Sequence, residues 1–140
     1  SDQVLAGPVA SVLGPSGGGG LETSCLALGL GRSAADFIES ESNHRSELRE
    51  PALRIRSEEV ALRQRLLALA IVPDPEAIMR LRVDCTRHVL RATQASLLVA
   101  KGTGFLTPHP ASRWAGQALF FLVWSCPRAV GEPLLGGLID

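Results

Sequence analysis

Hydrophobic side chains recur at the spacing of an α-helix from residue 21 to about residue 125, and prolines and glycines divide that stretch into segments. The sharpest boundary is Asp74-Pro75-Glu76. There the aspartate can accept the first free amides of a helix, the proline suits the first turn, and the glutamate complements the helix dipole. An apolar stripe then continues to about Ala100, where Gly102-Thr103-Gly104 ends the segment. The sequence therefore predicts a long helix over residues 75–100.

The same periodicity predicts three further helices, over residues 21–44, 53–71 and 110–125. Pro51 interrupts the chain before the second of these helices, and Pro127 stops the last one. Amphipathic helices joined by short turns predict an all-α fold, a four-helix up-down bundle that spans residues 21–126. Residues 127–140 are expected to form a C-terminal tail.

The first twenty residues have a different pattern from the rest of the chain. Two short, partly β-branched runs, residues 4–7 and 9–13, are separated by Pro8 and followed by Gly17 to Gly20. Such runs are typical of one or two weak strands, and the glycines are typical of a linker. No Lys-Ser or Lys-Thr follows the glycines, so a phosphate-binding loop is the poorer interpretation. We expect residues 1–20 to be a remnant β segment with a Gly-rich linker.

Charge and apolar content exclude several classes of protein. Fourteen basic and fourteen acidic residues leave no net charge, which argues against binding to nucleic acid or to an anionic membrane surface. The apolar runs are much shorter than the ~20 residues that span a bilayer, and no leader peptide is visible. Three cysteines without CxxC spacing fit neither a disulfide framework nor a zinc site. These features predict a globular domain in the cytoplasm.

No metal centre is predicted. His44, His88 and His109 lie on three different segments without cysteines or carboxylates at ligand spacing, so they are expected to be surface or cap residues. Each cysteine lies on an apolar face and is expected to be a small buried hydrophobe. The arginines and glutamates alternate in sign over residues 45–65, a pattern typical of a solvated helix face with i,i+4 pairs.

The order of several motifs resembles the C-terminal helical domain of acyl-CoA dehydrogenases. Gly29 and Arg45 keep the sixteen-residue spacing of that family, and Pro51 follows as it does there. The segment 102–105, Gly-Thr-Gly-Phe, echoes the family's Gly-Gly-x-Gly-Tyr loop, one residue shorter. The distance from Gly104 to the next arginine, Arg113, also matches. The resemblance covers roughly residues 21–126, and the segment before it resembles the end of the family's middle β-domain.

The resemblance implies a flavoenzyme. Members of the family remove an α-proton from an acyl-CoA thioester with a carboxylate base, pass the β-hydride to FAD, and usually reduce an electron-transfer flavoprotein. Their bundle domain packs against its own copy and reaches the neighbour's FAD. Carried over by position, Arg45 would contact the flavin pyrophosphate, and Arg56, in place of the family's glutamine, would donate to the dinucleotide. Gly102 and Gly104 would let the backbone approach the adenosine half.

The departures from the family concern catalysis. Many members carry the base, a glutamate, where this chain has Trp124-Ser125, and others carry it where this chain has Gly19-Gly20. A serine without an activating partner cannot replace that base, so the catalytic residues stay unassigned. The family's N-terminal helical domain and most of its β-domain have no counterpart here, and we expect the chain alone to be an incomplete catalyst.

Two functions therefore remain open from the sequence. One is the C-terminal domain or a split subunit of a flavin-dependent acyl-CoA dehydrogenase. The alternative is a non-catalytic helical assembly or binding partner derived from that family. The missing glutamate favours the second, whereas Arg45 and the glycine loop favour the first. The ligand-binding half of a helical transcription regulator ranks last, since no helix-turn-helix is visible.

Overall fold

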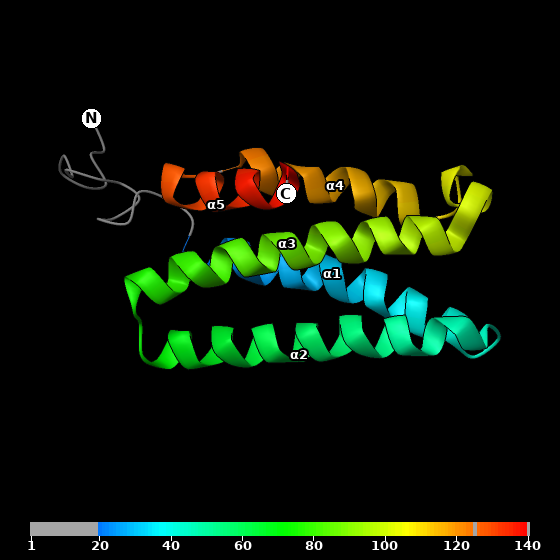
Figure 1. The fold of residues 1–140 in the computed structure, drawn as a ribbon, viewed down its shortest axis with the longest axis horizontal. Coiled ribbons are helices and arrows are strands. Elements are labelled where there is room, and N and C mark those ends of the chain that lie inside the picture. The colour runs from blue at the N-terminus through cyan, green and yellow to red at the C-terminus, as the bar shows by residue number, and fades with distance from the viewer. Residues whose placement is uncertain (1–19, 125, 140) are drawn as a thin grey trace, which may run out of the picture.

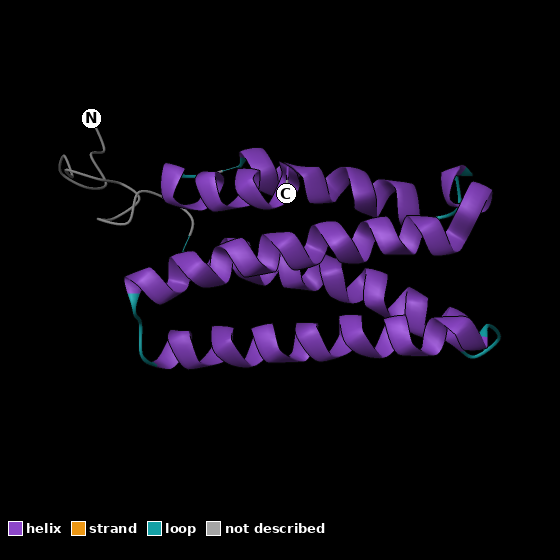
Figure 2. Ribbon diagram, in the orientation of Figure 1, coloured by secondary structure: helices purple, strands orange, loops and turns teal. Residues whose placement is uncertain are grey.

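The computed structural model describes residues 20–124 and 126–139, and these residues form a bundle of α-helices (Figure 1). No strand occurs within these ranges (Figure 2), so the predicted all-α fold is confirmed. The expected remnant β segment and Ser125 lie outside the described residues. The elements in chain order are α1 (Leu21–Ser42), the 3-10 turn η1 (Ser46–Leu48), α2 (Arg49–Ile71), α3 (Pro75–Ala100), the 3-10 turn η2 (Lys101–Phe105), α4 (Ala111–Val123) and α5 (Arg128–Ile139).

Helix α3 is the centre of the bundle and packs against each of the other four α-helices (Figure 1). It begins at Pro75 and ends at Ala100, as the sequence predicts. The Asp74 carboxylate accepts hydrogen bonds from the amides of Glu76 and Ala77, at 3.0 and 3.4 Å. These bonds satisfy two of the amides that have no partner inside the helix, which explains why the helix starts there.

Helix α2 begins four residues earlier than predicted, at Arg49, so Pro51 does not interrupt it. Pro51 is the third residue of the helix, where a missing N–H costs nothing because the first amides lack intrahelical acceptors. Only Ala52, Glu59 and Leu62 of α2 are buried, whereas Leu67 and Ala70, which are apolar, are exposed. Helix α2 therefore lies at the edge of the bundle and buries one narrow stripe.

A fifth helix, α5, occupies residues 128–139, where we expected a tail. Val130 and Leu134, four residues apart, are buried against Val83 of α3. Pro133 lies inside this helix, and several glycines weaken its helical pattern in the sequence. Packing of one apolar side of α5 against α3 offsets that poor intrinsic propensity.

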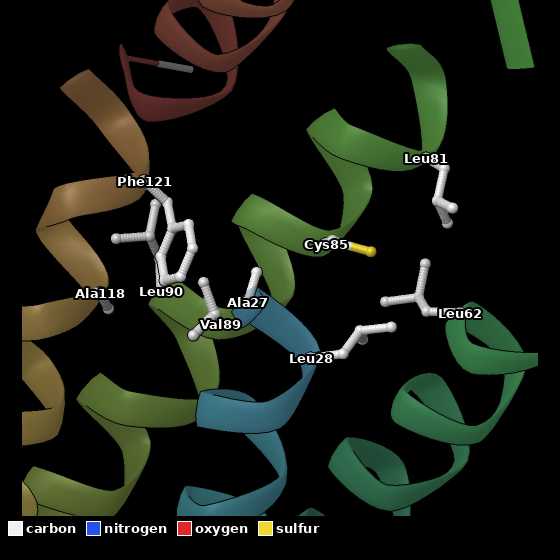
Figure 3. Packing of buried hydrophobic residues seen from close by; sticks show 9 residues of the cluster. All are labelled: Ala27, Leu28, Leu62, Leu81, Cys85, Val89, Leu90, Ala118 and Phe121. Atoms are coloured by element: carbon white, nitrogen blue, oxygen red, sulfur yellow. The ribbon is translucent and has the colours of Figure 1, made fainter. Parts of the chain in front are cut away.

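The main core lies between α1, α2, α3 and α4 (Figure 3). Leu81, Cys85 and Val89 of α3 are each fully buried, as the predicted stripe requires. Cys25, by contrast, is exposed, so the expectation that every cysteine is buried is wrong for that residue. Among the described residues no helix is both long enough and apolar enough to cross a bilayer. The residues of the main cluster are Ala27, Leu28, Leu62, Leu81, Cys85, Val89, Leu90, Ala118 and Phe121.

Candidate functional site

Arg45 lies in the connection between α1 and η1 and contacts the far end of α3. Its Nη1 donates to the carbonyl of Val99 at 2.9 Å, and its Nε donates to Glu47 Oε1 at 3.2 Å. Val99 belongs to the last turn of α3, whose carbonyl oxygens lack intrahelical donors and carry partial negative charge. The guanidinium therefore ties the α1–α2 connection to the end of α3 that leads into η2 (Figure 1).

Gly102 and Gly104 both lie in η2, but their surroundings differ. A Cβ at Gly102 would meet no heavy atom within 4 Å, so the backbone there is open. A Cβ at Gly104 would lie 2.9 Å from Leu97 Cδ1 and 3.0 Å from the Ala100 Cβ. Gly104 is thus required by packing against α3, and only Gly102 presents an accessible backbone to a ligand.

Arg56 lies on α2 and bridges to α1. It hydrogen-bonds to Asp36, its Nη2 donates to Glu39 Oε2 at 2.8 Å, and its Nη1 donates to Glu59 Oε2 at 3.3 Å. Hydrogen bonding to Asp36 and the neighbouring carboxylates, which outweighs the effect of burial, raises the pKa of Arg56. The side chain is an interhelical clamp, and a dinucleotide contact would have to replace one of these carboxylates.

No sequence pattern indicates a buried histidine, yet His88 of α3 is only 1 % exposed. Its Nδ1 lies 3.0 Å from Oε2 of Glu58 on α2, and Arg91 hydrogen-bonds to the other oxygen of Glu58. The expectation of surface or cap histidines is therefore wrong for His88. It holds for the exposed His44 and for His109, whose Nδ1 accepts from the Ala111 amide at the start of α4.

The His88–Glu58 pair predicts acid sensitivity. Burial raises the pKa of Glu58, but hydrogen bonds from His88 and Arg91 outweigh it, so the pKa lies below its usual value of 4.5. The unfolded chain then binds more protons near that pH than the folded chain does, and acid favours unfolding. We expect the stabilisation from the Glu58 carboxylate to be present above pH 4.5 and to be lost as the pH falls through the folded-state pKa.

Chemical denaturation of the wild type and of Glu58→Gln between pH 3 and 7 measures this effect. The wild type should be the more stable at neutral pH, and the difference should shrink on acidification. Glu50→Gln is the matched control because Glu50 is an exposed glutamate of the same helix whose ion pair with Arg54 is solvated. Parallel pH profiles of the wild type and Glu58→Gln would contradict the assignment.

Arg82 is the second charged group that the sequence did not single out. It is fully buried on α3, and its Nη2 donates to the carbonyl of Trp124, just after α4, at 2.9 Å. Burial lowers the pKa of Arg82 and raises that of the Cys85 thiol to about 12, so Cys85 is a protonated core residue at neutral pH. Within residues 20–124 and 126–139 no three potential ligands gather into a metal-binding group.

Neither a family model nor a curated protein sequence matches this chain. Among solved structures, the fold is similar to a structure described as the electron transferring flavoprotein of Acidaminococcus fermentans, studied for flavin-based electron bifurcation. The two share 16 % sequence identity with a TM-score of 0.71 over 85 % of this chain. This chain spans only 35 % of that protein chain. The helical fold is thus one that a flavoprotein structure also contains.

Proposed function

We propose that this chain is the C-terminal helical domain, or a separate subunit, of a cytoplasmic flavin-dependent acyl-CoA dehydrogenase, and that it provides one edge of an FAD site. One observation carries the proposal. Arg45 and Gly102, which are far apart in the sequence, lie at the same end of the bundle because Arg45 bonds to Val99. The similarity of the fold to part of a flavoprotein structure supports the same class.

The geometry of Arg45 leaves room for an anion. Its Nε and Nη1 are engaged by Glu47 and Val99, Glu41 Oε2 lies 3.8 Å from Nη1, and Nη2 makes no hydrogen bond to any described residue. The side chain is partly exposed, at 28 %. Glu47 is 66 % exposed and can swing away, so a diphosphate can replace it on the guanidinium. The open backbone at Gly102 would border the adenosine half of the dinucleotide.

In this proposal the chain positions a cofactor but does not complete a catalyst. FAD would supply the hydride acceptor for oxidation of an acyl-CoA substrate, and an electron-transfer flavoprotein is the proposed electron acceptor. Arg56 would act through its clamp between α1 and α2, and it contacts the dinucleotide only if a carboxylate is displaced. The base and the pocket for the flavin ring would come from further domains, because a cofactor pocket buries most of its ligand.

A specific observation favours the alternative, a non-catalytic assembly partner. Helices α4 and α5, and the residue that follows α4, expose several large apolar side chains, and two of these, Phe120 and Trp124, stack with ring centroids 5.2 Å apart. So much exposed apolar surface marks a protein interface. A second copy of the chain or a missing domain would cover it. The other exposed large apolar residues of α4 and α5 are Leu119, Val123, Leu135, Leu138 and Ile139.

Flavin content separates the two functions. We expect the purified chain alone to bind FAD weakly, and the assembly purified with its native partners to show a flavin absorbance spectrum. In that assembly Arg45→Ala should weaken FAD binding by roughly 10–150-fold, because a charge-assisted hydrogen bond contributes about 1.5–3 kcal/mol. The mass of the assembly shows whether copies of this chain or other subunits cover α4 and α5.

Two control variants distinguish flavin contact from loss of structure. Arg45→Lys keeps a cationic donor for the end of α3 but lacks the planar donor fork of a guanidinium. It should therefore preserve thermal stability and still weaken FAD binding. Arg49→Ala, at an exposed arginine of α2, should leave FAD binding unchanged. Tight, stoichiometric binding of FAD by the isolated chain would contradict the proposal that the chain provides only one edge of the FAD site. A native assembly without flavin would favour the non-catalytic alternative.

A further inference from the structure

Lys101, which directly follows α3, has a backbone conformation that lysine rarely adopts. Its φ of 54° and ψ of −146° lie in a region that glycine occupies readily and other residues avoid. No other residue except glycine has a positive φ within residues 20–124 and 126–139. A lysine at this position costs folding free energy, and residues held in such conformations cluster at functional sites.

The end of α3 does not need the Lys101 ammonium as a cap. The four carbonyls of its last turn, residues 97–100, already accept hydrogen bonds. Their donors are the Lys101 amide, the Arg45 guanidinium and the Thr103 hydroxyl. The ammonium is exposed, and it makes no hydrogen bond or ion pair with any described residue. Capping of the helix therefore does not explain why a lysine replaces the glycine that this backbone favours.

Glu47 lies within the influence of two cations. Its Oε1 accepts a hydrogen bond from Arg45 Nε at 3.2 Å. A hydrogen bond from its own backbone amide, the bond from Arg45, and the charges of Arg45 and Lys101 lower the pKa of the Glu47 carboxyl. Arg45 also bonds to Val99, two residues before Lys101, so both cations lie at one end of the bundle (Figure 1). They act together on the position of one exposed carboxylate.

The Glu47 carboxylate uses only part of the donors around it. The Nε and Nη2 atoms of Arg45 form one edge of the planar guanidinium, a fork that matches two oxygens of a carboxylate or phosphate. Glu47 accepts from Nε, whereas Nη2 makes no hydrogen bond to a described residue. Glu41 approaches the other side of the guanidinium, 3.8 Å from Nη1. The fork and the Lys101 ammonium are thus open to a larger anion.

We propose that Lys101 is the second cation of a diphosphate site with Arg45, and that Glu47 fills this site while no ligand is bound. The Arg45 fork would bind one phosphate, the Lys101 ammonium would bind the other, and Glu47 would turn into solvent. A diphosphate has more charge and more acceptor oxygens than one carboxylate, so two cations favour it over Glu47. The inference rests on the proposed flavin function, in which the diphosphate belongs to FAD.

NMR spectroscopy of the isolated full chain tests the site directly. Lys101 is the only lysine of the chain, so lysine labelled with ¹³C at Cε gives one side-chain signal. At low ionic strength, sodium pyrophosphate should shift this signal and saturate in the millimolar range, as exposed ion pairs require. Sodium acetate at the same ionic strength is the matched control and should bind at least about tenfold more weakly. An equal response to acetate, or no saturable response to pyrophosphate, would overturn the diphosphate site.

Two substitutions separate the charge of Lys101 from its backbone strain. Lys101→Gly and Lys101→Ala should both weaken pyrophosphate binding by about three- to tenfold, followed by the backbone amide signal of Gly102. Lys101→Gly should melt about 2–6 °C higher than Lys101→Ala, because only glycine relieves the strained φ. Equal melting temperatures would contradict the strain at this position. Unchanged binding in both variants would contradict the role of the ammonium.

Two further variants test the competition by Glu47. Glu47→Gln should tighten pyrophosphate binding by roughly three- to tenfold, because it removes the negative charge that competes for Arg45 and Lys101. Arg128→Ala removes an exposed arginine from α5 and is the matched control, which should leave the affinity unchanged. Weaker binding in Glu47→Gln would show that Glu47 does not occupy the position of the anion.

This inference and the proposed function fail in different ways. FAD binding by the native assembly that is weakened by Arg45→Ala but not by Lys101→Ala would overturn the role of Lys101 and leave the flavin function standing. Pyrophosphate binding that depends on Lys101, together with a native assembly free of flavin, would overturn the flavin function and leave the diphosphate site standing.

Discussion

Leu81→Ala is expected to lower the free energy of unfolding by about 2–5 kcal/mol, the range for truncating a buried leucine. Leu81 is fully buried on α3 and belongs to the same core cluster as Leu62 and Cys85 (Figure 3). Removing its branched end leaves a cavity at the contact between α2 and α3, and helices anchored at both ends cannot close it completely. Urea unfolding followed by circular dichroism measures the change.

Leu98→Ala is the matched control, because it makes the same substitution on the same helix. Leu98 is 79 % exposed, so its truncation should alter the free energy of unfolding by less than about 0.5 kcal/mol. A similar loss in both variants would mean that the substitution acts through helix formation rather than through the core. A negligible effect of Leu81→Ala would contradict the packing of α3 at the centre of the bundle.

Gly31→Ala should destabilise the chain by about 1–3 kcal/mol, the usual cost of forcing an extra methyl group into a packed interior. A Cβ at Gly31 of α1 would lie 2.9 Å from Cδ2 and 3.1 Å from Nε2 of His88. The imidazole cannot retreat easily, because its Nδ1 is held by Glu58 on α2. The added methyl group therefore pushes α1 and α3 apart or breaks the His88–Glu58 contact.

Gly29→Ala, two residues away on the same helix, should have the opposite sign. A Cβ at Gly29 meets nothing within 4 Å, and the residue is exposed. Alanine in a helix interior is more stable than glycine by roughly 0.5–1 kcal/mol. Thermal unfolding of the two variants measures the difference directly. If both substitutions stabilised the chain, the close contact between α1 and His88 would be disproved.

Helix boundaries were predictable where a local signal marks them. The Asp74 cap acts on amides two and three residues away, so the start of α3 is visible in the sequence. Helix α2 starts earlier than the sequence predicts, because Pro51 lies in the first turn, where proline is tolerated, and not in the helix interior, where it would end the helix. The signal for α5 is weak, because Pro133 and the glycines hide the i,i+4 pair Val130 and Leu134.

In the candidate site, too, some features are predictable from the sequence and others depend on contacts between residues distant in the chain. The resemblance to acyl-CoA dehydrogenases implies a shared role for Arg45 and the 102–105 segment, and the structure brings both to one end of the bundle. Their contact with FAD stays a prediction. The buried pair of Glu58 and His88 spans thirty residues on two helices, so no motif of fixed spacing reveals it.

Caps, prolines and apolar periodicity act within one or two turns of chain, and they are enough to define an all-α protein with one long helix over residues 75–100. The rotation of each helix about its axis depends on neighbours that are distant in sequence. That rotation decided that Glu58 meets His88, that Arg56 clamps α1 to α2, and that Cys25 stays exposed. Side-chain packing and charge pairing between helices together determine this rotation, and the local sequence of a single helix does not reveal it.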